Sequence, residues 1–100
     1  KKIRLCLEQN KLFYVYLIIS ERKGRFKTYV GYTNNLKQRV TKHNTNRGAK
    51  STRGRYWKLI YQKKFNKKRL ALKYEYFFKN NKILRNKIKN KYVNKTRSNS

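Results

Sequence analysis

Acidic residues are almost missing from this sequence of 100 residues: there are three glutamates, Glu8, Glu21 and Glu75, and no aspartate. Lysine and arginine together number 30, so the formal net charge at pH 7 is +27. An excess of this size indicates a polyanionic partner, and nucleic acid is the usual one. An A/T-rich genome would also raise the lysine and asparagine content, but it would keep some aspartate. The shortage of acid excludes two-metal chemistry, which needs several clustered carboxylates.

Cysteine, proline and long hydrophobic runs are scarce as well. Cys6 is the only cysteine, which excludes a disulfide framework or a cysteine-based zinc site within this chain. An intracellular compartment is the simplest fit to that cysteine content. The longest apolar run, residues 12–19, is too short to span a membrane and too β-branched and aromatic for a signal peptide. We therefore expect a soluble chain with no membrane partner.

Strand and helix patterns alternate along the rest of the chain. The first strand is apolar on both faces, which predicts an interior position in a sheet. The second strand should return antiparallel after a polar connection that contains Gly24. The predicted elements are strands over residues 12–20, 27–32 and 57–62, helices over 34–43 and 67–80, a loop over 44–56 and a short helix near 83–88.

The predicted fold class is α/β, a small layered domain whose three-stranded sheet is a β-hairpin plus a third strand, flanked by helices. The predicted organisation is a basic extension over residues 1–11, one domain over residues 12–81, and a basic, partly disordered tail over residues 82–100. In the helix over residues 67–80, the apolar stripe should be Leu70, Tyr74 and Phe77, with Ala71, Glu75 and Phe78 beside it.

Residues 28–43 bring several chemically active types close together. Gly31 permits a backbone geometry or a close approach that a side chain would block. Leu36, Val40 and His43 fall on one face of the following helix, and Arg39 lies one turn before His43. One interpretation is an ordinary amphipathic helix, with Arg39 solvated and His43 half-buried. The other interpretation is a reactive site built around these residues.

Glu75 is placed on or next to the buried stripe of its helix, where a charge is costly unless it is paired or binds a cation. An ion pair with a nearby arginine or lysine is one interpretation. The other is a single metal carboxylate, because Mg²⁺ keeps several waters and often takes only one or two carboxylates. A tyrosine hydroxyl beside such a metal could relay or accept a proton during attack on a phosphodiester, and Arg39 would bind the phosphate.

Two tripeptides and two helices carry a family resemblance. Residues 14–16 (YVY) and 29–31 (YVG), a helix bearing Arg39 and His43, and a later helix bearing Glu75 together resemble the GIY-YIG endonuclease superfamily over residues 12–80. The wider pattern YVGYT…LKQRV…HN…GAKSTRGRYWKL…ALKYE resembles its small one-domain branch and the eukaryotic structure-specific endonuclease catalytic subunit.

The resemblance implies an endonuclease that hydrolyses DNA phosphodiester bonds with one Mg²⁺ or Mn²⁺ ion, on branched or flap DNA in repair or recombination. It implies a nuclear location if the source is eukaryotic. Residue by residue, it makes Tyr16 the general base, Tyr29 the tyrosine of the second tripeptide and Arg39 the phosphate ligand. It makes His43 a hydrogen-bonding residue one turn further on, and Glu75 the metal ligand.

Two features depart from the family pattern. Tyr14 replaces the glycine of the first tripeptide, and we expect it to pack as an ordinary strand aromatic. The resemblance also implies a scaffold subunit as a partner. That subunit docks on a cysteine-rich zinc-binding module, which a chain with one cysteine lacks.

Basic residues in and just before the loop over residues 44–56 are candidate phosphate contacts. They are Lys42, Arg47, Lys50, Arg53 and Arg55. A solvated basic loop is the alternative. For the whole chain, the alternatives to an enzyme are a non-catalytic basic nucleic-acid-binding protein and an inactive nuclease-like scaffold. In each case we expect recognition of DNA shape rather than of base sequence.

Overall fold

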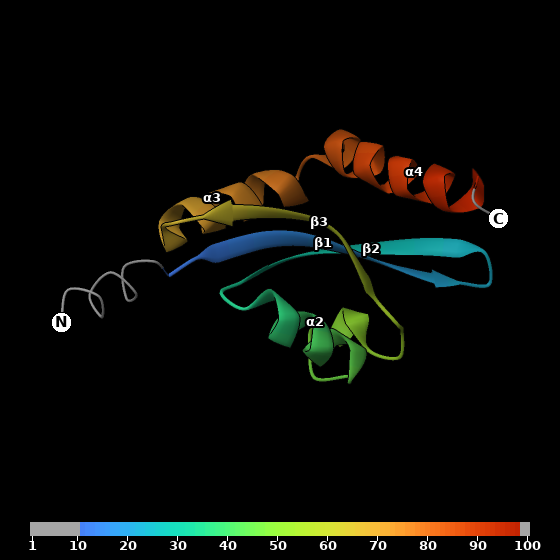
Figure 1. The fold of residues 1–100 in the computed structure, drawn as a ribbon, viewed down its shortest axis with the longest axis horizontal. Coiled ribbons are helices and arrows are strands. Elements are labelled where there is room, and N and C mark those ends of the chain that lie inside the picture. Colours follow the sequence, from blue (N-terminus) through green and yellow to red (C-terminus); the bar gives the residue numbers. More distant parts are fainter. Residues whose placement is uncertain (1–10, 99–100) are drawn as a thin grey trace.

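The computed structural model describes residues 11–98, and residues 1–10 of the predicted N-terminal extension lie outside that part of the chain. Strands and helices follow one another much as the sequence predicts (Figure 1). The elements in chain order are β1 (Phe13–Arg22), β2 (Arg25–Thr33), α2 (Leu36–Asn44), the 3₁₀ helix η1 (Lys50–Thr52), β3 (Lys58–Phe65), α3 (Lys68–Lys79) and α4 (Lys82–Ser98).

The three strands form one antiparallel sheet in the order β2-β1-β3. The predicted interior position of the first strand is therefore confirmed, because β1 pairs on both of its edges. Its register against β2 sets Tyr16 opposite Gly31 and Ile18 opposite Tyr29. Side chains alternate between the two faces of a strand, so Tyr16 and Ile18 share one face of β1, and Val15 and Leu17 share the other.

The connection between β1 and β2 is tighter than the sequence predicts. The expected polar connection over residues 21–26 is reduced to Lys23 and Gly24, and Arg22 pairs with Arg25 as the last rung of the ladder. Both turn residues have positive φ angles, 52° for Lys23 and 78° for Gly24. Two such residues make a type I′ turn, whose twist matches that of the flanking strands. The strands therefore extend further than polarity alone suggests.

Helices cover both faces of the sheet (Figure 1), and each face has its own apolar cluster. On the α2 face, Tyr16, Ile18 and Trp57 are buried, and Leu36 and Val40 pack against them. On the α3 and α4 face, the buried residues are Val15, Leu17, Val30, Ala71 and Phe78. None of the helices within residues 11–98 combines the length and the hydrophobicity needed to cross a lipid bilayer.

Helix α3 is rotated relative to the sequence prediction. Ala71 and Phe78 are fully buried, whereas Leu70 and Phe77 of the predicted apolar stripe are 40% and 50% exposed. The small side chain of Ala71 is part of the buried cluster beneath the helix. The residues that face the sheet are therefore Ala71 and Phe78, which the sequence prediction placed beside the apolar stripe. The assignment of Leu70 and Phe77 to the core was therefore wrong.

Helix α4 extends well beyond the predicted short helix near residues 83–88 and includes residues of the expected disordered tail. Asn81 accepts a hydrogen bond from the Leu84 backbone N–H at 3.1 Å, as a helix cap does. Leu84 and Ile88 pack on the cluster between α3 and the sheet, and Val93 is buried. Tertiary packing of these few apolar residues supports a helix whose sequence is otherwise mostly basic and polar.

Candidate active site

Helix α2 presents Arg39 and His43 to the sheet. Asn35 caps the helix: its side chain accepts a hydrogen bond from the Gln38 backbone N–H at 3.1 Å. Leu36 and Val40 pack on the cluster of the α2 face. The same helical face then carries His43 into the interior, where it is fully buried. The prediction that Leu36, Val40 and His43 share one face is thus confirmed. His43 is fully buried, whereas the amphipathic-helix interpretation expected it to be half-buried.

The Tyr16 ring lies directly over Gly31 on the neighbouring strand. A Cβ atom added to Gly31 would overlap the Tyr16 hydroxyl and the ring carbon that bears it. The backbone at Gly31 has no positive φ angle, so the requirement for glycine here comes from the close approach. The sequence pattern YVG therefore leaves the space that the tyrosine of YVY occupies.

A hydrogen-bonded group of three side chains is centred on the Tyr16 hydroxyl. The Tyr16 oxygen lies 2.7 Å from Nε2 of His43, and the Arg39 Nε–H donates to the same oxygen at 3.4 Å. Burial raises the pKa of Tyr16 to about 12, although the neighbouring Arg39 opposes the rise. The Tyr16 hydroxyl is therefore protonated at neutral pH and is held between a donor and a potential proton acceptor.

His43 is surrounded by aromatic rings. The Tyr29 ring meets His43 edge-on, with centroids 5.2 Å apart and an interplanar angle of 61°, and Tyr16 approaches in a similar way at 5.8 Å. Burial lowers the pKa of His43 from its ordinary value of 6.5, and the positive charge of Arg39 lowers it further. The imidazole is therefore neutral at neutral pH, so one of its two nitrogens is free to accept a proton.

Residues of the predicted loop complete the surroundings of His43, and the sequence reasoning missed them. Nδ1 of His43 lies 2.9 Å from the Thr52 hydroxyl, and Thr52 is fully buried in η1. Gly48 lies so close to the His43 ring that a Cβ atom would overlap it. Both residues fall in the stretch GAKSTRGRYWKL that carries the family resemblance, but threonine and glycine in a basic loop give no chemical signal by type.

The loop is fastened to helix α2 through Trp57. The Asn44 side chain accepts from the Trp57 backbone N–H at 2.6 Å and donates to the Trp57 carbonyl at 3.1 Å. The Trp57 indole N–H donates to the Thr52 carbonyl at 2.8 Å, and Trp57 is only 1% exposed. Trp57 itself precedes β3 rather than beginning it, because the strand starts at Lys58.

Glu75 of α3 acts on the same region through its charge. Its negative charge contributes to the raised pKa values of Tyr16 and Tyr32, although burial is the larger cause for both hydroxyls. The Glu75 side chain is 19% exposed and forms an ion pair with Lys79 at 3.5 Å, one turn along the helix. Lys79 is 52% exposed, so the pair is solvent-screened and weak.

The residues around Glu75 fit one hard cation held largely by water and substrate oxygens. Within residues 11–98, no group of three or more histidine, cysteine, aspartate or glutamate side chains is gathered for a metal ion. A carboxylate that is partly exposed and paired with an exposed surface lysine can take up a cation in exchange. Mg²⁺ needs no more than one or two such carboxylates when substrate phosphate supplies further oxygens.

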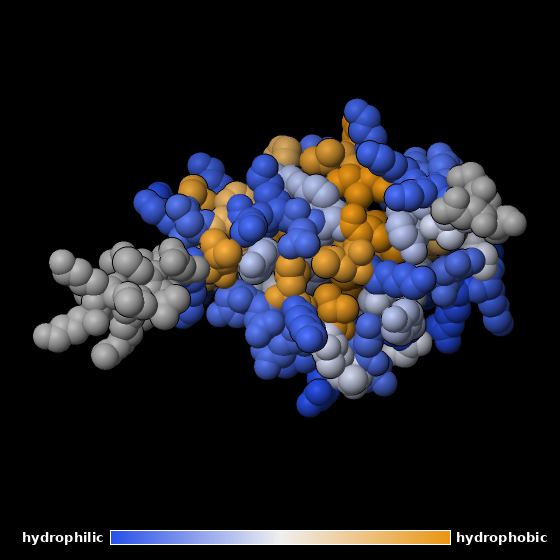
Figure 2. Space-filling model, in the orientation of Figure 1, coloured by the Kyte–Doolittle hydropathy of each residue, from blue (hydrophilic) through white to orange (hydrophobic). Residues whose placement is uncertain are grey.

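The predicted phosphate-contacting residues lie at the end of α2 and in the loop that follows. Arg47, Lys50 and Arg53 are exposed, and Lys42 is half-buried. Arg55 differs, because its guanidinium lies 5.9 Å from the Trp57 ring centroid and donates to the Ser20 carbonyl at 3.5 Å. Hydrophilic side chains also cover much of the face shown in Figure 2, with an apolar band across its middle.

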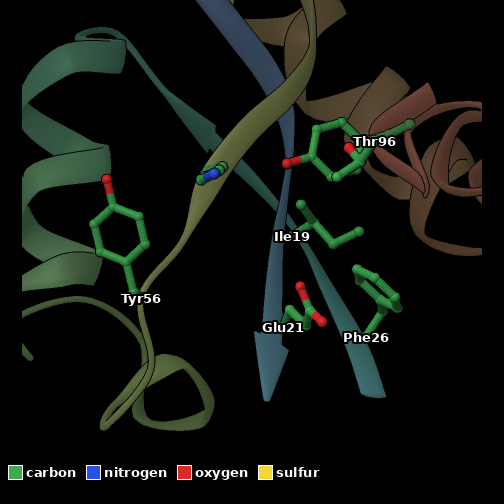
Figure 3. Close-up of a pocket in the computed structure, with 7 residues that line it drawn as sticks. Ile19, Glu21, Phe26, Tyr56 and Thr96 are labelled. Carbon is green, nitrogen blue, oxygen red and sulfur yellow. The ribbon is translucent and has the colours of Figure 1, made fainter. Parts of the chain in front are cut away.

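A cavity of about 240 Å³ lies elsewhere, and none of the predicted catalytic residues lines it. Figure 3 shows its walls, which come from β1, β2, the start of β3 and α4. The lining residues are Ile19, Glu21, Phe26, Tyr56, Lys58, Tyr92 and Thr96. Glu21 is thus a second glutamate in a different environment from Glu75.

Comparison with known proteins identifies the family. The family model for the GIY-YIG catalytic domain matches residues 12–92. A UPF0213 protein of Bacillus licheniformis is 41% identical over 83 residues, which cover 82% of this chain and 80% of that protein. A UPF0213 protein of Bacillus cereus is 36% identical over 90 residues, covering 89% and 86%. One of Oceanobacillus iheyensis is 43% identical over 67 residues, covering 66% and 74%. No solved structure matches the chain.

These relatives are bacterial, and their names assign no activity. They are of the small one-domain kind that the sequence pattern indicates, and they lend no support to a nuclear location. The family itself implies nuclease activity in general terms. The match over residues 12–92 and the identities of the relatives show that the chain belongs to the GIY-YIG catalytic-domain family.

Proposed function

We propose that this protein is a metal-dependent endonuclease that hydrolyses DNA phosphodiester bonds, with a preference for branched or flap DNA. The observation that carries the proposal is the buried hydrogen bond of 2.7 Å between the Tyr16 hydroxyl and Nε2 of His43, with Arg39 donating to the same oxygen. A tyrosine whose proton can pass to a neutral histidine is equipped to accept a proton from an attacking water.

Tyr16 works in this proposal as a relay. With a pKa raised to about 12, the hydroxyl is not an ionised base at neutral pH. As water attacks phosphorus, its proton passes to the Tyr16 oxygen while the original Tyr16 proton passes to Nε2 of His43. The water oxygen forms a new bond to phosphorus, the bond from phosphorus to the leaving sugar oxygen breaks, and that oxygen takes a proton from solvent. Tyr16 is left unchanged and His43 becomes an imidazolium. General-base assistance of this kind typically contributes about 10²–10⁴ in rate.

Arg39 provides the positive charge that the reaction needs at phosphorus. Its guanidinium has five N–H donors, and only Nε is directed to the Tyr16 oxygen. The remaining donors suit a phosphate oxygen, on which negative charge increases during attack. A charged donor aimed at developing charge is typically worth about 10²–10³ in rate.

Glu75 would hold the single divalent ion, Mg²⁺ or Mn²⁺. When bound, the ion would withdraw charge from phosphate oxygens and lower the pKa of a coordinated water. The side chain is only 19% exposed, so it is already ordered by packing. Its charge makes the smallest contribution to the raised pKa of Tyr16. In this proposal, the bound phosphodiester would connect the metal at Glu75 with the proton relay.

The basic residues supply affinity for the substrate. The net charge of +27 favours any nucleic acid. Exposed Arg47, Lys50 and Arg53 follow directly on the helix that carries Arg39 and His43, so a phosphate backbone bound along the loop would lead to the relay. The preference for branched DNA and a role in repair or recombination follow from the family resemblance.

Cleavage of defined DNA substrates tests the proposal. Purified protein is incubated with duplex, flap and four-way-junction DNA, in Mg²⁺ or in EDTA, and products are resolved on denaturing gels. We expect cleavage only with Mg²⁺, and a loss of at least about 10²-fold in Tyr16→Phe. Tyr14→Phe is the matched control, because Tyr14 lies two residues earlier on the same strand face. DNA binding with no cleavage of any substrate would instead support the non-catalytic alternatives.

A further inference from the structure

Thr52 contacts the side of the His43 ring opposite to Tyr16. Its hydroxyl oxygen lies 2.9 Å from Nδ1 of His43, while Tyr16 is bonded to Nε2. The same Thr52 oxygen lies 2.8 Å from the Ala49 carbonyl oxygen. His43 and Thr52 are fully buried, so water does not compete for the contact between them.

The contact with Ala49 determines where the hydrogen atoms lie. A carbonyl oxygen carries no hydrogen, so the contact of 2.8 Å requires the Thr52 hydroxyl to donate to it. The Thr52 oxygen is then an acceptor toward His43, and Nδ1 must carry a hydrogen. A neutral imidazole has one N–H, so Nε2 is bare and the Tyr16 hydroxyl donates to it.

We propose that Thr52 is a positioning residue that holds neutral His43 in the Nδ1–H tautomer, so that Nε2 is open to the Tyr16 proton. This inference rests on the hydrolytic role proposed above for Tyr16 and His43. The Nε2–H tautomer predominates in free histidine, and it would direct a second hydrogen at the Tyr16 oxygen. Tyr16 could not then pass its proton to the ring.

Thr52 is itself held in place from several directions. Its backbone N–H donates to the Ala49 carbonyl at 3.0 Å, so the hydroxyl and the N–H of one residue share that acceptor. Its carbonyl accepts from the Trp57 indole at 2.8 Å. Asn44, the residue after His43, bonds both backbone groups of Trp57. Thr52 is thus connected to His43 in two ways. One is the direct contact with Nδ1, and the other runs through Trp57 to Asn44, the next residue in the chain.

The same contact also suits the second half of the proton transfer. When the Tyr16 proton reaches Nε2, the imidazolium has two N–H donors. Nδ1–H remains bonded to the Thr52 oxygen, and the new Nε2–H is bonded to the Tyr16 oxygen. No hydrogen atom on Thr52 has to move in either state, so Thr52 supports the neutral and the charged ring alike.

Nitrogen NMR of the full chain tests the tautomer directly. His43 is the only histidine, so the imidazole region of a ¹⁵N-labelled sample contains one pair of nitrogen signals. Above the pKa of His43, we expect an N–H-type shift at Nδ1 and an unprotonated-type shift at Nε2 in wild type and in Thr52→Ser. In Thr52→Val, which keeps the shape without the hydroxyl, both signals should move toward the Nε2–H pattern. A wild-type spectrum with Nε2 protonated would overturn the inference, whatever the variants do.

Cleavage kinetics give the second readout. Thr52→Val should lower kcat by at least about 10²-fold with little change in KM for DNA, and Thr52→Ser should restore most of the loss. A Thr52→Val protein that melts early but keeps the wild-type tautomer would assign Thr52 a purely structural role and refute the inference. Wild type that cuts no DNA would defeat the proposed function instead, and the NMR result would still decide the tautomer.

Discussion

The Tyr16 hydroxyl has three neighbours, and each limits what this group can do. His43 Nε2 takes its hydrogen, Arg39 donates to its oxygen, and Gly31 leaves the space in which it lies. Burial raises its pKa, so the group suits the proposed relay better than it suits a free base. The chemistry at this residue therefore depends on the neutral histidine and on the absence of a side chain at position 31.

Gly31→Ala tests the importance of that space. The new methyl group would overlap the Tyr16 hydroxyl, so Tyr16 must move and its bond to His43 must lengthen. We expect cleavage to fall by about 10²-fold or more, with a loss of about 1–3 kcal/mol in the free energy of unfolding, as for other overpacked cores. Gel assays measure the cleavage rate, and denaturant melts of the same sample measure the free energy of unfolding. Wild-type activity in Gly31→Ala would show that the position of Tyr16 is unimportant.

The pH dependence of stability reports on His43. Its pKa is lowered on folding, so its contribution to stability is present above the unfolded value of about 6.5 and is lost as pH falls through the folded value. The difference in stability between wild type and His43→Gln isolates the contribution of His43, which is the only histidine in the chain. We expect this contribution to fall by at most about 1.4 kcal/mol per pH unit between about pH 6.5 and 5. Denaturant melts of His43→Gln should show a smaller loss of stability than wild type over the same range. Equal slopes for the two proteins would contradict the buried neutral imidazole.

Sequence reasoning found some residues of this site and missed others for a physical reason. Helical spacing predicted that Arg39 and His43 lie side by side, and the family resemblance of residues 14–16 added Tyr16. The structure joins both residues to the Tyr16 hydroxyl by hydrogen bonds. Thr52 and Gly48 were missed because their part depends on how a loop folds back on His43. A contact of that kind leaves no periodic pattern in the chain.

At the scale of the elements, burial patterns predicted strands better than helices. β1 is apolar on both faces and is central in the sheet, as its sequence indicates. For α3, the sequence predicted the wrong row of side chains on the sheet. The two rows differ by only one position, and Ala71 is too small to be recognised as a core residue from its type. The length of α4 was missed because its few apolar residues support a helix only once they pack against the rest of the molecule.

The N-cap of α2 offers a prediction at this scale. Asn35→Ala removes the side-chain acceptor of the Gln38 N–H, and losing such a cap typically costs about 0.5–2 kcal/mol. Because α2 carries both Arg39 and His43, we expect the melting temperature and the cleavage rate to fall together. Asn34→Ala is the matched control, since Asn34 is exposed and lies just outside the helix. Equal melting curves for the two variants would contradict the capping role.

At the scale of the whole molecule, the net charge bears on binding and the fold bears on the proposed chemistry. A net charge of +27 binds polyanions of any sequence, whereas the relay occupies a small region between α2 and the sheet. Charge alone does not distinguish an enzyme from a basic binding protein. The proposed distinction is Glu75, a carboxylate on α3 whose charge makes a small contribution to the raised pKa of Tyr16.

The salt dependence of DNA binding follows from the charge. Each phosphate neutralised on duplex DNA should contribute about −0.9 to the slope of log binding constant against log salt concentration. With several exposed basic residues in the loop after α2, we expect a slope of several units, measured by fluorescence anisotropy with labelled duplex. A binding constant that is unchanged between low and moderate salt would contradict an electrostatic interface.

The most direct test of the central claim compares two glutamates. Glu75→Gln keeps the size of the side chain and removes its charge, and Glu21→Gln does the same at the cavity that α4 helps to line. Since Lys79 is exposed, losing its ion pair should change stability by no more than about 1 kcal/mol. Mg²⁺-dependent cleavage, DNA binding and melting temperature are measured on both proteins. We predict that Glu75→Gln stops cutting while it binds DNA and melts like wild type, and that Glu21→Gln is unaffected; cleavage by Glu75→Gln at the wild-type rate in Mg²⁺ would contradict the account.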